Sequence, residues 1–359
     1  MSPLPRVRPG SPSRVRLLLV ISTVMALGAA ACGPSGQPAS PAAPAPSQSA
    51  APAAGPSSGT PTLDKVIIAT PGSSLSYLPA KVADEKGFFK EEGVDVEWTQ
   101  MGGDLSVTAV MAGEVGYTTV PSSASAAAAQ GAPIKTVVFM SVKLQHTLVA
   151  GPSITTVQDL AGKRIGVQRQ GDLTAFESKR VVDMFNVPNV TIVSVGPDVQ
   201  RLAALESGAV DAIVASAPWD IKAEQQGMHV LLPIGNVLEI PQAGLATSDT
   251  KIQNDADEIA KLVRGIIRGT QYIRDPGHHD EVAGIIARWV DLSPEEASTA
   301  LDRVRGTYSA TATPTDAQIQ LYLEMLRATG AATDSTTVDQ ITDFSIARRV
   351  AAEMGVTSQ

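Results

Sequence analysis

Hydroxyl-bearing and aromatic side chains gather in four loops, each of which directly follows a predicted strand. Hydroxyl groups donate and accept hydrogen bonds and aromatic rings stack, so these residue types suit the binding of a small ligand of mixed polarity. In open α/β sheets, ligands bind beyond the carboxyl ends of the strands, where these loops are expected. The candidate ligand-binding residues are Ser73, Ser74, Tyr77, Ser122, Ser123, Gln170, Gly171, Asp172, Thr174, Ser216 and Trp219.

Each candidate has a structural alternative. The serines could be turn or helix N-cap residues, and Asp172 could be the N-cap of the helix that follows it. Trp219 could be a packing residue between two lobes of the fold, which are described below, although the polar neighbours Asp220 and Lys222 favour its partial exposure. Arg169 is the clearest cation in these loops, and the scarcity of cations favours pyrimidine-like or other aromatic ligands over small anions. Sulfonates remain open, because helix N-termini bind anions through backbone N–H groups.

The sequence contains no catalytic pattern. The four histidines, at positions 146, 229, 278 and 279, form no HExxH motif, and the last two lie in a predicted solvated loop. The G-x-S-x-G, P-loop and Rossmann motifs are missing. A single cysteine excludes disulfides within the chain and cysteine-based metal clusters. We therefore expect no catalytic residue, no metal site and no cofactor.

The charge balance bears on the partners of the protein. The chain has 28 basic and 36 acidic residues, for a formal net charge of −8. Binding to nucleic acid requires a basic face that neutralises phosphates. Nucleic acid is therefore disfavoured as a partner.

The single cysteine, Cys32, directly follows a leader segment. Four arginines precede Leu17–Ala31, an uncharged and largely apolar run of fifteen residues. This run is shorter than the ~18–20 residues that span a bilayer, so we interpret residues 1–31 as a cleaved signal peptide. Ala29–Cys32 resembles the lipobox of bacterial lipoproteins, in which the cysteine carries the lipid; the alternative is an ordinary secretory signal that leaves a free thiol. Removal of the leader changes the net charge to −12.

A segment without charge or large apolar side chains separates the leader from the body. Every residue from Gly33 to Thr62 is Gly, Pro, Ala, Ser, Gln or Thr. Such a composition cannot bury enough surface to offset its ordering entropy. We therefore predict a disordered Pro/Ala/Ser-rich tether over residues 32–62.

The body alternates predicted strands with helices and contains an internal echo. Strands are predicted at 65–69, 94–98, 164–167 and 191–195, and helices at 79–90, 105–112 and 174–185, which favours a mostly parallel α/β sheet. Residues 109–121 parallel 204–218: each has a helix end, a glycine, a valine two residues later, and a strand that ends in small residues and proline. Chance similarity is the alternative to our interpretation, two lobes of like topology.

Two crossing segments and a helical C-terminal region complete the predicted organisation. Leu144–Ala150 leaves the first lobe and residues 236–245 return to it, which allows hinge closure over a ligand. We assign 63–147 to lobe 1, with helices of 243–355 packing on it, and 148–240 to lobe 2. Apolar residues recur at helical spacing over 255–274, and Ser293-Pro294-Glu295-Glu296 forms a capping box.

Several ordered motifs run along residues 77–212: YLPA at 77–80 with EKGFF at 85–89 and EGV at 92–94, QGAP at 130–133, DLAGKRIGV at 159–167, and GAVDA at 208–212. In these motifs the chain resembles the substrate-binding proteins of ABC importers of the NMT1/THI5-like, or SsuA-like, family, the nitrate, sulfonate, taurine and thiamine-precursor group. The resemblance covers residues 64–350. One departure is Gly116, where the family usually has Asp.

The resemblance implies a type II periplasmic-binding-protein-like fold, with two α/β lobes around a ligand cleft. It also implies an extracytoplasmic lipoprotein, anchored to the outer face of the cell membrane through Cys32 or periplasmic, that delivers a small molecule to an ABC permease. We expect a monomer and no enzymatic activity. The alternatives are an enzyme on the same scaffold, of the pyrimidine-precursor or menaquinone-pathway type, and a surface sensor.

Overall fold

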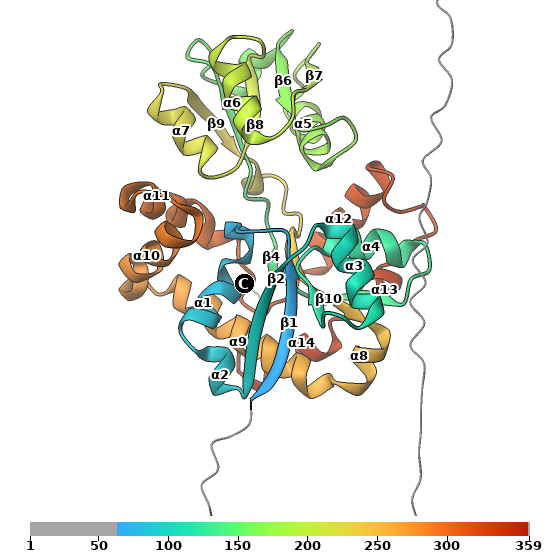
Figure 1. The fold of residues 1–359 in the computed structure, drawn as a ribbon. Helices are drawn as coiled ribbons and strands as arrows, with labels where there is room; N and C mark the ends of the chain where they lie inside the picture. The colour runs from blue at the N-terminus through green and yellow to red at the C-terminus, as the bar shows by residue number, and fades with distance from the viewer. Residues whose placement is uncertain (1–62, 358–359) are drawn as a thin grey trace, which may run out of the picture. The chain divides into compact units, whose positions relative to one another are not determined.

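The structure is a computed structural model that describes residues 63–357. The predicted signal peptide, the predicted tether and Cys32 lie outside the described residues, and the described residues belong to one compact unit. Two five-stranded sheets form its framework (Figure 1). The first sheet contains β1 (Asp64–Thr70), β2 (Val94–Gln100), β3 (Tyr117–Thr118), β4 (Ile134–Ser141) and β10 (Ala243–Ser248). The second contains β5 (Thr147–Ala150), β6 (Arg164–Val167), β7 (Thr191–Ser194), β8 (Ala212–Ala215) and β9 (His229–Pro233).

The two sheets have the same strand order. The order is β2-β1-β3-β10-β4 in the first sheet and β7-β6-β8-β5-β9 in the second. In each sheet the first three strands are parallel, and the fourth strand is antiparallel to both of its neighbours. The sheets are therefore mixed rather than mostly parallel. The expectation of two lobes of like topology is confirmed, and we call the part around each sheet the first and the second lobe.

Residues 142–146 and 234–242 connect the lobes, and each of these segments leads into the fourth strand of a sheet. β5 follows directly after β4 but pairs in the second sheet, and β10 follows the second lobe but pairs in the first sheet. The crossing segments predicted at 144–150 and 236–245 include β5 and the start of β10. Their antiparallel pairing within the sheets was not predicted, because a strand reveals its partners only when the chain is folded.

Helices cover the faces of both sheets. α1 (Leu78–Glu85) and α2 (Phe88–Glu91) replace the single helix predicted over 79–90, because Gly87 adopts a left-handed φ of 75° and ends the regular helix. The other helices around the first sheet, in the first lobe, are α3 (Gly103–Ala112), α4 (Pro121–Ala129) and α8 (Asp249–Asn254). The second lobe contains α5 (Leu173–Met184), α6 (Asp198–Glu206) and α7 (Trp219–Gln225).

The C-terminal region is helical, as expected. It contains α9 (Ala256–Arg274), α10 (His279–Val290), α11 (Pro294–Val304), α12 (Asp316–Ala328), α13 (Val338–Ile341) and α14 (Ser345–Glu353). The Ser293 capping box is present, with the Ser293 Oγ accepting from the Glu296 N–H. The prediction of a solvated loop at His278 is wrong, because Pro276–His278 form a short 3₁₀ turn and His279 begins α10. The ring of His278 stacks on that of Tyr272, with 3.7 Å between the ring centroids.

Helix α9 joins the C-terminal region to the first sheet. Its predicted apolar face is buried, and each fully buried isoleucine stabilises the fold by about 2 kcal/mol. Gly269 allows α9 to approach α1 closely, because a Cβ there would lie 2.2 Å from the Pro79 carbonyl oxygen. The contact between α9 and α1 therefore holds α1 against the first lobe, and the loop of residues 71–77 directly precedes α1.

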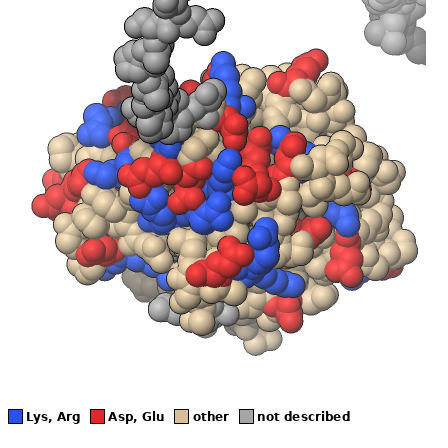
Figure 2. All heavy atoms as spheres, turned by 90° about the horizontal axis from the view of Figure 1, so that it is seen from below, with Lys and Arg blue, Asp and Glu red and all other residues tan. Residues whose placement is uncertain are grey.

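Charges of both signs are mixed on the lower face of the molecule (Figure 2). Ion pairs of α9 contribute to this mixing, including Arg264–Glu92 at 2.6 Å and Lys261–Asp64 at 3.0 Å. Such an alternation leaves no broad basic area on this face (Figure 2).

Candidate functional site

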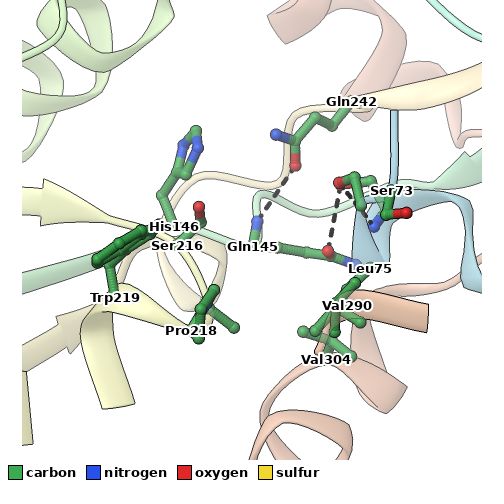
Figure 3. Close-up of a pocket in the computed structure, with 13 residues that line it drawn as sticks. Ser73, Leu75, Gln145, His146, Ser216, Pro218, Trp219, Gln242, Val290 and Val304 are labelled. Carbon is green, nitrogen blue, oxygen red and sulfur yellow. Dashed lines mark hydrogen bonds between the residues drawn. The ribbon is translucent and has the colours of Figure 1, made fainter. Parts of the chain in front are cut away.

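Loops of both lobes line a cavity of about 340 Å³. One side comes from the loop after β1 and from α10 and α11, and the opposite side comes from the loop after β8 (Figure 3). Two segments that connect the lobes lie between these sides. The cavity is lined by Ser73, Ser74, Leu75, Ser76, Gln145, His146, Ser216, Ala217, Pro218, Trp219, Gln242, Val290 and Val304.

The loop after β1 supplies the hydroxyl groups on the first-lobe side. The Ser74 Oγ caps a short 3₁₀ turn, Leu75–Tyr77, by accepting from the Ser76 N–H at 3.3 Å. The Ser76 hydroxyl, which is buried, donates to the Gln145 Oε1 at 3.2 Å. Ser74 therefore has the capping role offered as its alternative and still lines the cavity, so the two roles are compatible.

Two glutamines come from the connecting segments, and sequence inspection missed both. The Gln145 backbone N–H donates to the Gln242 Oε1 at 3.4 Å (Figure 3), and the Gln145 Nε2 donates to the Thr307 hydroxyl at 2.8 Å. These bonds join residues that are 97 and 162 positions apart in the sequence. No local pattern marks such residues, and only the position of the predicted crossing segments hinted at them.

His146 is the histidine of the cavity lining. Its Nδ1 lies 2.8 and 2.9 Å from the two carboxylate oxygens of Glu177, a residue of α5 that is completely buried. Burial alone lowers the pKa of His146, but attraction to the Glu177 carboxylate and their hydrogen bond outweigh it, so this pKa is raised. The arrangement favours the imidazolium form.

Trp219 begins α7 on the second-lobe side, where its ring is half-buried, in agreement with the partial exposure that its neighbours favoured. The Lys222 Nζ lies 4.9 Å from the ring centroid, so the ring has a cation on one face. Ser216 is fixed by Asp198, which accepts from the Ser216 N–H and hydroxyl, both at 3.3 Å. The cavity therefore combines one indole ring with several fixed polar groups.

Tyr77 lies beside this cavity rather than in its lining. It lines an adjoining cavity of about 330 Å³, with Ser73 common to both and with Trp98 and Trp289 close by. Burial raises the pKa of the Tyr77 hydroxyl, which the Thr119 side chain partly offsets. The hydroxyl is therefore a neutral donor at physiological pH.

Six other candidates lie outside both cavities in the described structure. Ser122 and Ser123 occupy the first turn of α4. Asp172 caps α5, with its Oδ1 accepting from the Ala175 N–H at 3.1 Å and from the Thr174 hydroxyl at 2.7 Å. Gly171 precedes this cap with a φ of 79°, and the Gln170 amide donates to the Ile192 carbonyl at 2.8 Å. A ligand contact at these six residues stays a prediction.

An ion pair connects the lobes next to the cavity. The Arg303 Nη1, at the end of α11, lies 2.6 Å from the Asp220 Oδ2, at the start of α7, and Arg303 also contacts Glu224. Asp220 is only 1 % exposed and also accepts from the Thr147 hydroxyl at 3.0 Å. Trp219 precedes Asp220 and Val304 follows Arg303, and both of these neighbours line the cavity. The same two helical turns therefore hold the ion pair between the lobes and part of the cavity wall.

Residues 63–357 contain neither a cluster of metal ligands nor a helix that could cross a membrane. No group of three or more His, Cys, Asp or Glu side chains within this range could ligate a metal ion. Within the same range, no helix is both long and apolar enough to cross a membrane.

Comparisons with known proteins agree with this geometry. The model of the family described as NMT1/THI5 like matches residues 75–278. YtlA of Bacillus subtilis (strain 168), which carries a provisional description as a binding protein, is 25% identical over 309 residues, or 81% of this chain and 91% of YtlA.

Two solved structures share the fold. The periplasmic aliphatic sulphonate binding protein SsuA from Escherichia coli has a TM-score of 0.63 and 15% identity, over 79% of this chain and 99% of SsuA. The periplasmic nitrate-binding protein NrtA from Synechocystis PCC 6803 has a TM-score of 0.64 and 15% identity, over 83% of this chain and 91% of NrtA. Two α/β lobes around a polar cavity and a family model that matches more than half of the sequence lead to one assignment: the chain belongs to the NMT1/THI5-like family and has the periplasmic-binding-protein fold.

Proposed function

We propose that the protein is an extracytoplasmic solute-binding lipoprotein, which captures a small molecule between its two lobes and delivers it to an ABC importer. The observation that carries this proposal is the cavity of about 340 Å³, which both lobes line with polar groups and one indole ring. Its volume lies in the range of small-molecule sites, roughly 300–1,000 Å³. The family and the descriptions of its relatives support the same role.

The composition of the cavity indicates the kind of ligand. Its lining contains no lysine, arginine, aspartate or glutamate within the described residues. The Trp219 ring suits a flat ligand that stacks, and the Ser and Gln side chains suit carbonyl, ring nitrogen or sulfonate groups. Pyrimidine-like compounds, aromatic acids and sulfonates are therefore the classes to test.

A catalytic role fits the site less well than a binding role. Nucleophilic catalysis needs a hydroxyl or thiol within hydrogen-bond reach of a base. In the part of the chain that the structure describes, His146 makes its hydrogen bonds to the Glu177 carboxylate and none to a serine or threonine hydroxyl. The site has the groups that bind a ligand but lacks an assembled nucleophile and base.

A thermal-shift screen tests ligand capture. Purified protein is heated with sulfonates, nitrate, pyrimidines, flavins and aromatic acids, and a true ligand raises the melting temperature because it binds only the folded state. Small-angle scattering with the same compound should show contraction as the lobes close. A stabilising compound that leaves the radius of gyration unchanged, or whose effect survives Trp219→Ala, would count against the proposed cleft.

Attachment to the membrane is tested separately. In a bacterial host that modifies lipoproteins, the wild-type chain should incorporate radiolabelled palmitate and fractionate with membranes, and Cys32→Ser should do neither. Incorporation of label into the Cys32→Ser chain would refute lipid attachment at this residue. Uptake of the identified ligand by cells that lack ABC permeases for that ligand would refute delivery to an importer.

A further inference from the structure

The His146 ring has a second nitrogen that the fold does not use. Its Nδ1 pairs with Glu177, whereas its Nε2 makes no hydrogen bond to any residue between 63 and 357. The residue lines the cleft cavity together with Gln145 and Ser216 (Figure 3). A ring nitrogen without a protein partner at such a place is available to a ligand.

Glu177 determines which state of the ring is present. A carboxylate that is completely buried is costly unless it is paired, and His146 is its hydrogen-bond partner in the described structure. Both carboxylate oxygens accept from the same Nδ1, so the carboxylate favours a proton on that nitrogen. Protonation of the Nε2 then makes the ring a cation whose free N–H is a charge-assisted donor.

We propose that His146 is the specificity-determining residue of this cleft: its charged Nε2–H, oriented by Glu177, donates to an oxygen of the ligand, and the ligand carries such an acceptor oxygen and no positive charge. The inference rests on the proposed function, because it requires that a ligand occupies the cleft. The imidazolium and the carboxylate together are neutral, but His146 is the member of the pair that lines the cleft cavity, so a cation is rejected and an acceptor is favoured.

Other charged groups near His146 do not cancel this effect. On α6, the Arg201 guanidinium lies 2.6 Å from the Asp198 carboxylate, so these two charges offset one another. His146 also lines a second cavity, of about 540 Å³, on which Arg303 and Glu224 pair with each other. The remaining charged residues on that cavity are Lys143, Asp302 and Arg305.

These remaining groups have acidic or basic partners as well. Lys143 lies 2.5 Å from the Glu239 carboxylate, and Arg305 lies 3.8 Å from the Asp302 carboxylate. The groups that face His146 are thus charge pairs, and Glu177 is the group that contacts it directly. Ligand binding should therefore follow the protonation of His146.

The first test needs no ligand. Long-range ¹H–¹⁵N spectra of the uniformly labelled full chain report the protonation of each histidine ring, and His146→Gln assigns the signal. We expect His146 to titrate above the ordinary value of about 6.5, and to titrate lower in Glu177→Gln. A titration that is unchanged in Glu177→Gln, or that lies below the ordinary value in the wild type, would overturn the inference.

The second test uses four probes: ethanesulfonate, benzoate, thymine and choline. Calorimetry at pH 6 and pH 9 measures their affinities for the wild type, for His146→Gln and for the matched control His229→Gln. His229 is a suitable control because its Nδ1 donates to the Ile154 carbonyl oxygen at 3.0 Å, and neither residue lines the cleft cavity. Gln at position 146 keeps an amide donor near the Nε2 position but cannot titrate.

The outcomes separate this inference from the proposed function. We expect at least one of the first three probes to bind the wild type and His229→Gln about tenfold more tightly at pH 6 than at pH 9, and His146→Gln to lose this difference. Choline should not bind. Binding that is unchanged by His146→Gln, or binding of choline, would overturn this inference alone, whereas no binding by any of the four would overturn both.

Discussion

The ion pair between Arg303 and Asp220 should control the balance between closed and open lobes. Arg303→Met keeps most of the aliphatic volume and removes the cation. Asp220, 1 % exposed, then remains as an uncompensated carboxylate in the closed arrangement. Because separation of the lobes would hydrate this carboxylate, we expect the substitution to favour the open state rather than to unfold the protein.

The magnitude follows from the contacts. Loss of one partner of a buried ion pair costs about 3–5 kcal/mol. The Arg303 side chain is 23% exposed, and Asp220 retains the Thr147 hydroxyl, so we expect about 2 kcal/mol. This free energy corresponds to a shift of about 30-fold in the ratio of closed to open states. If the closed state binds the ligand, affinity falls in proportion to the closed fraction, by at most about 30-fold.

Distances between spin labels measure the shift directly. With Cys32 replaced by Ser, the chain contains no cysteine, so labels at Thr108→Cys and Ser207→Cys, on exposed positions of the two lobes, are unambiguous. We expect a longer distance distribution for Arg303→Met without ligand, and recovery of the short one when Asp220→Asn is added. The matched control is Arg305→Met, since the ion pair of this arginine within residues 63–357 is with Asp302, three residues earlier, and does not join the lobes. An unchanged distribution for Arg303→Met, with calorimetric affinity also unchanged, would refute the reasoning.

Three further predictions concern the cleft and the packing beneath it. Trp219→Ala should weaken the ligand found in the thermal-shift screen at least about tenfold, equivalent to ~1.4 kcal/mol, by calorimetry; unchanged affinity would remove this ring from the site. Because the raised pKa of His146 contributes stability that is present below its unfolded value and lost as the pH rises through the folded value, urea unfolding should show a larger stability difference between the wild type and Glu177→Gln at pH 6 than at pH 9. A constant difference would contradict this sign. Gly269→Ala should destabilise the protein by about 1–3 kcal/mol, because the new methyl group meets the backbone of α1. The control Gly284→Ala meets only an arginine side chain at 3.6 Å and should be neutral or stabilising by up to about 1 kcal/mol, so equal effects of the two would exclude the packing argument.

Features that depend on neighbouring residues could be predicted from the sequence. The Ser293 capping box and the apolar face of α9 are set by spacing within one or two helical turns, and the structure has both. Ser73, Ser74, Ser216 and Trp219 were found because strand-end loops can be located from alternating strands and helices, and all four line the cavity.

Features that depend on distant segments could not be predicted. Gln145, His146 and Gln242 lie in connecting segments without a helical or strand period, and folding brings them together. Glu177 lies in an ordinary helical stretch of α5, where nothing in the sequence distinguishes a buried carboxylate from an exposed one. The residues within 170–174 that were predicted from the sequence to bind ligand lie outside both cavities. Their polar side chains instead make hydrogen bonds to backbone groups of the protein.

The late position of β10 along the chain has a consequence for the order in which the two sheets form during synthesis. The second sheet is formed by the contiguous segment from Thr147 to Pro233, so it can be completed as soon as that segment has appeared. The first sheet must wait for β10, with β4 exposed along one edge until Ala243–Ser248 arrives. The lobe that begins first along the chain is thus finished last, and its unpaired strand edge during that interval is the point at which helper proteins would protect the nascent chain from aggregation.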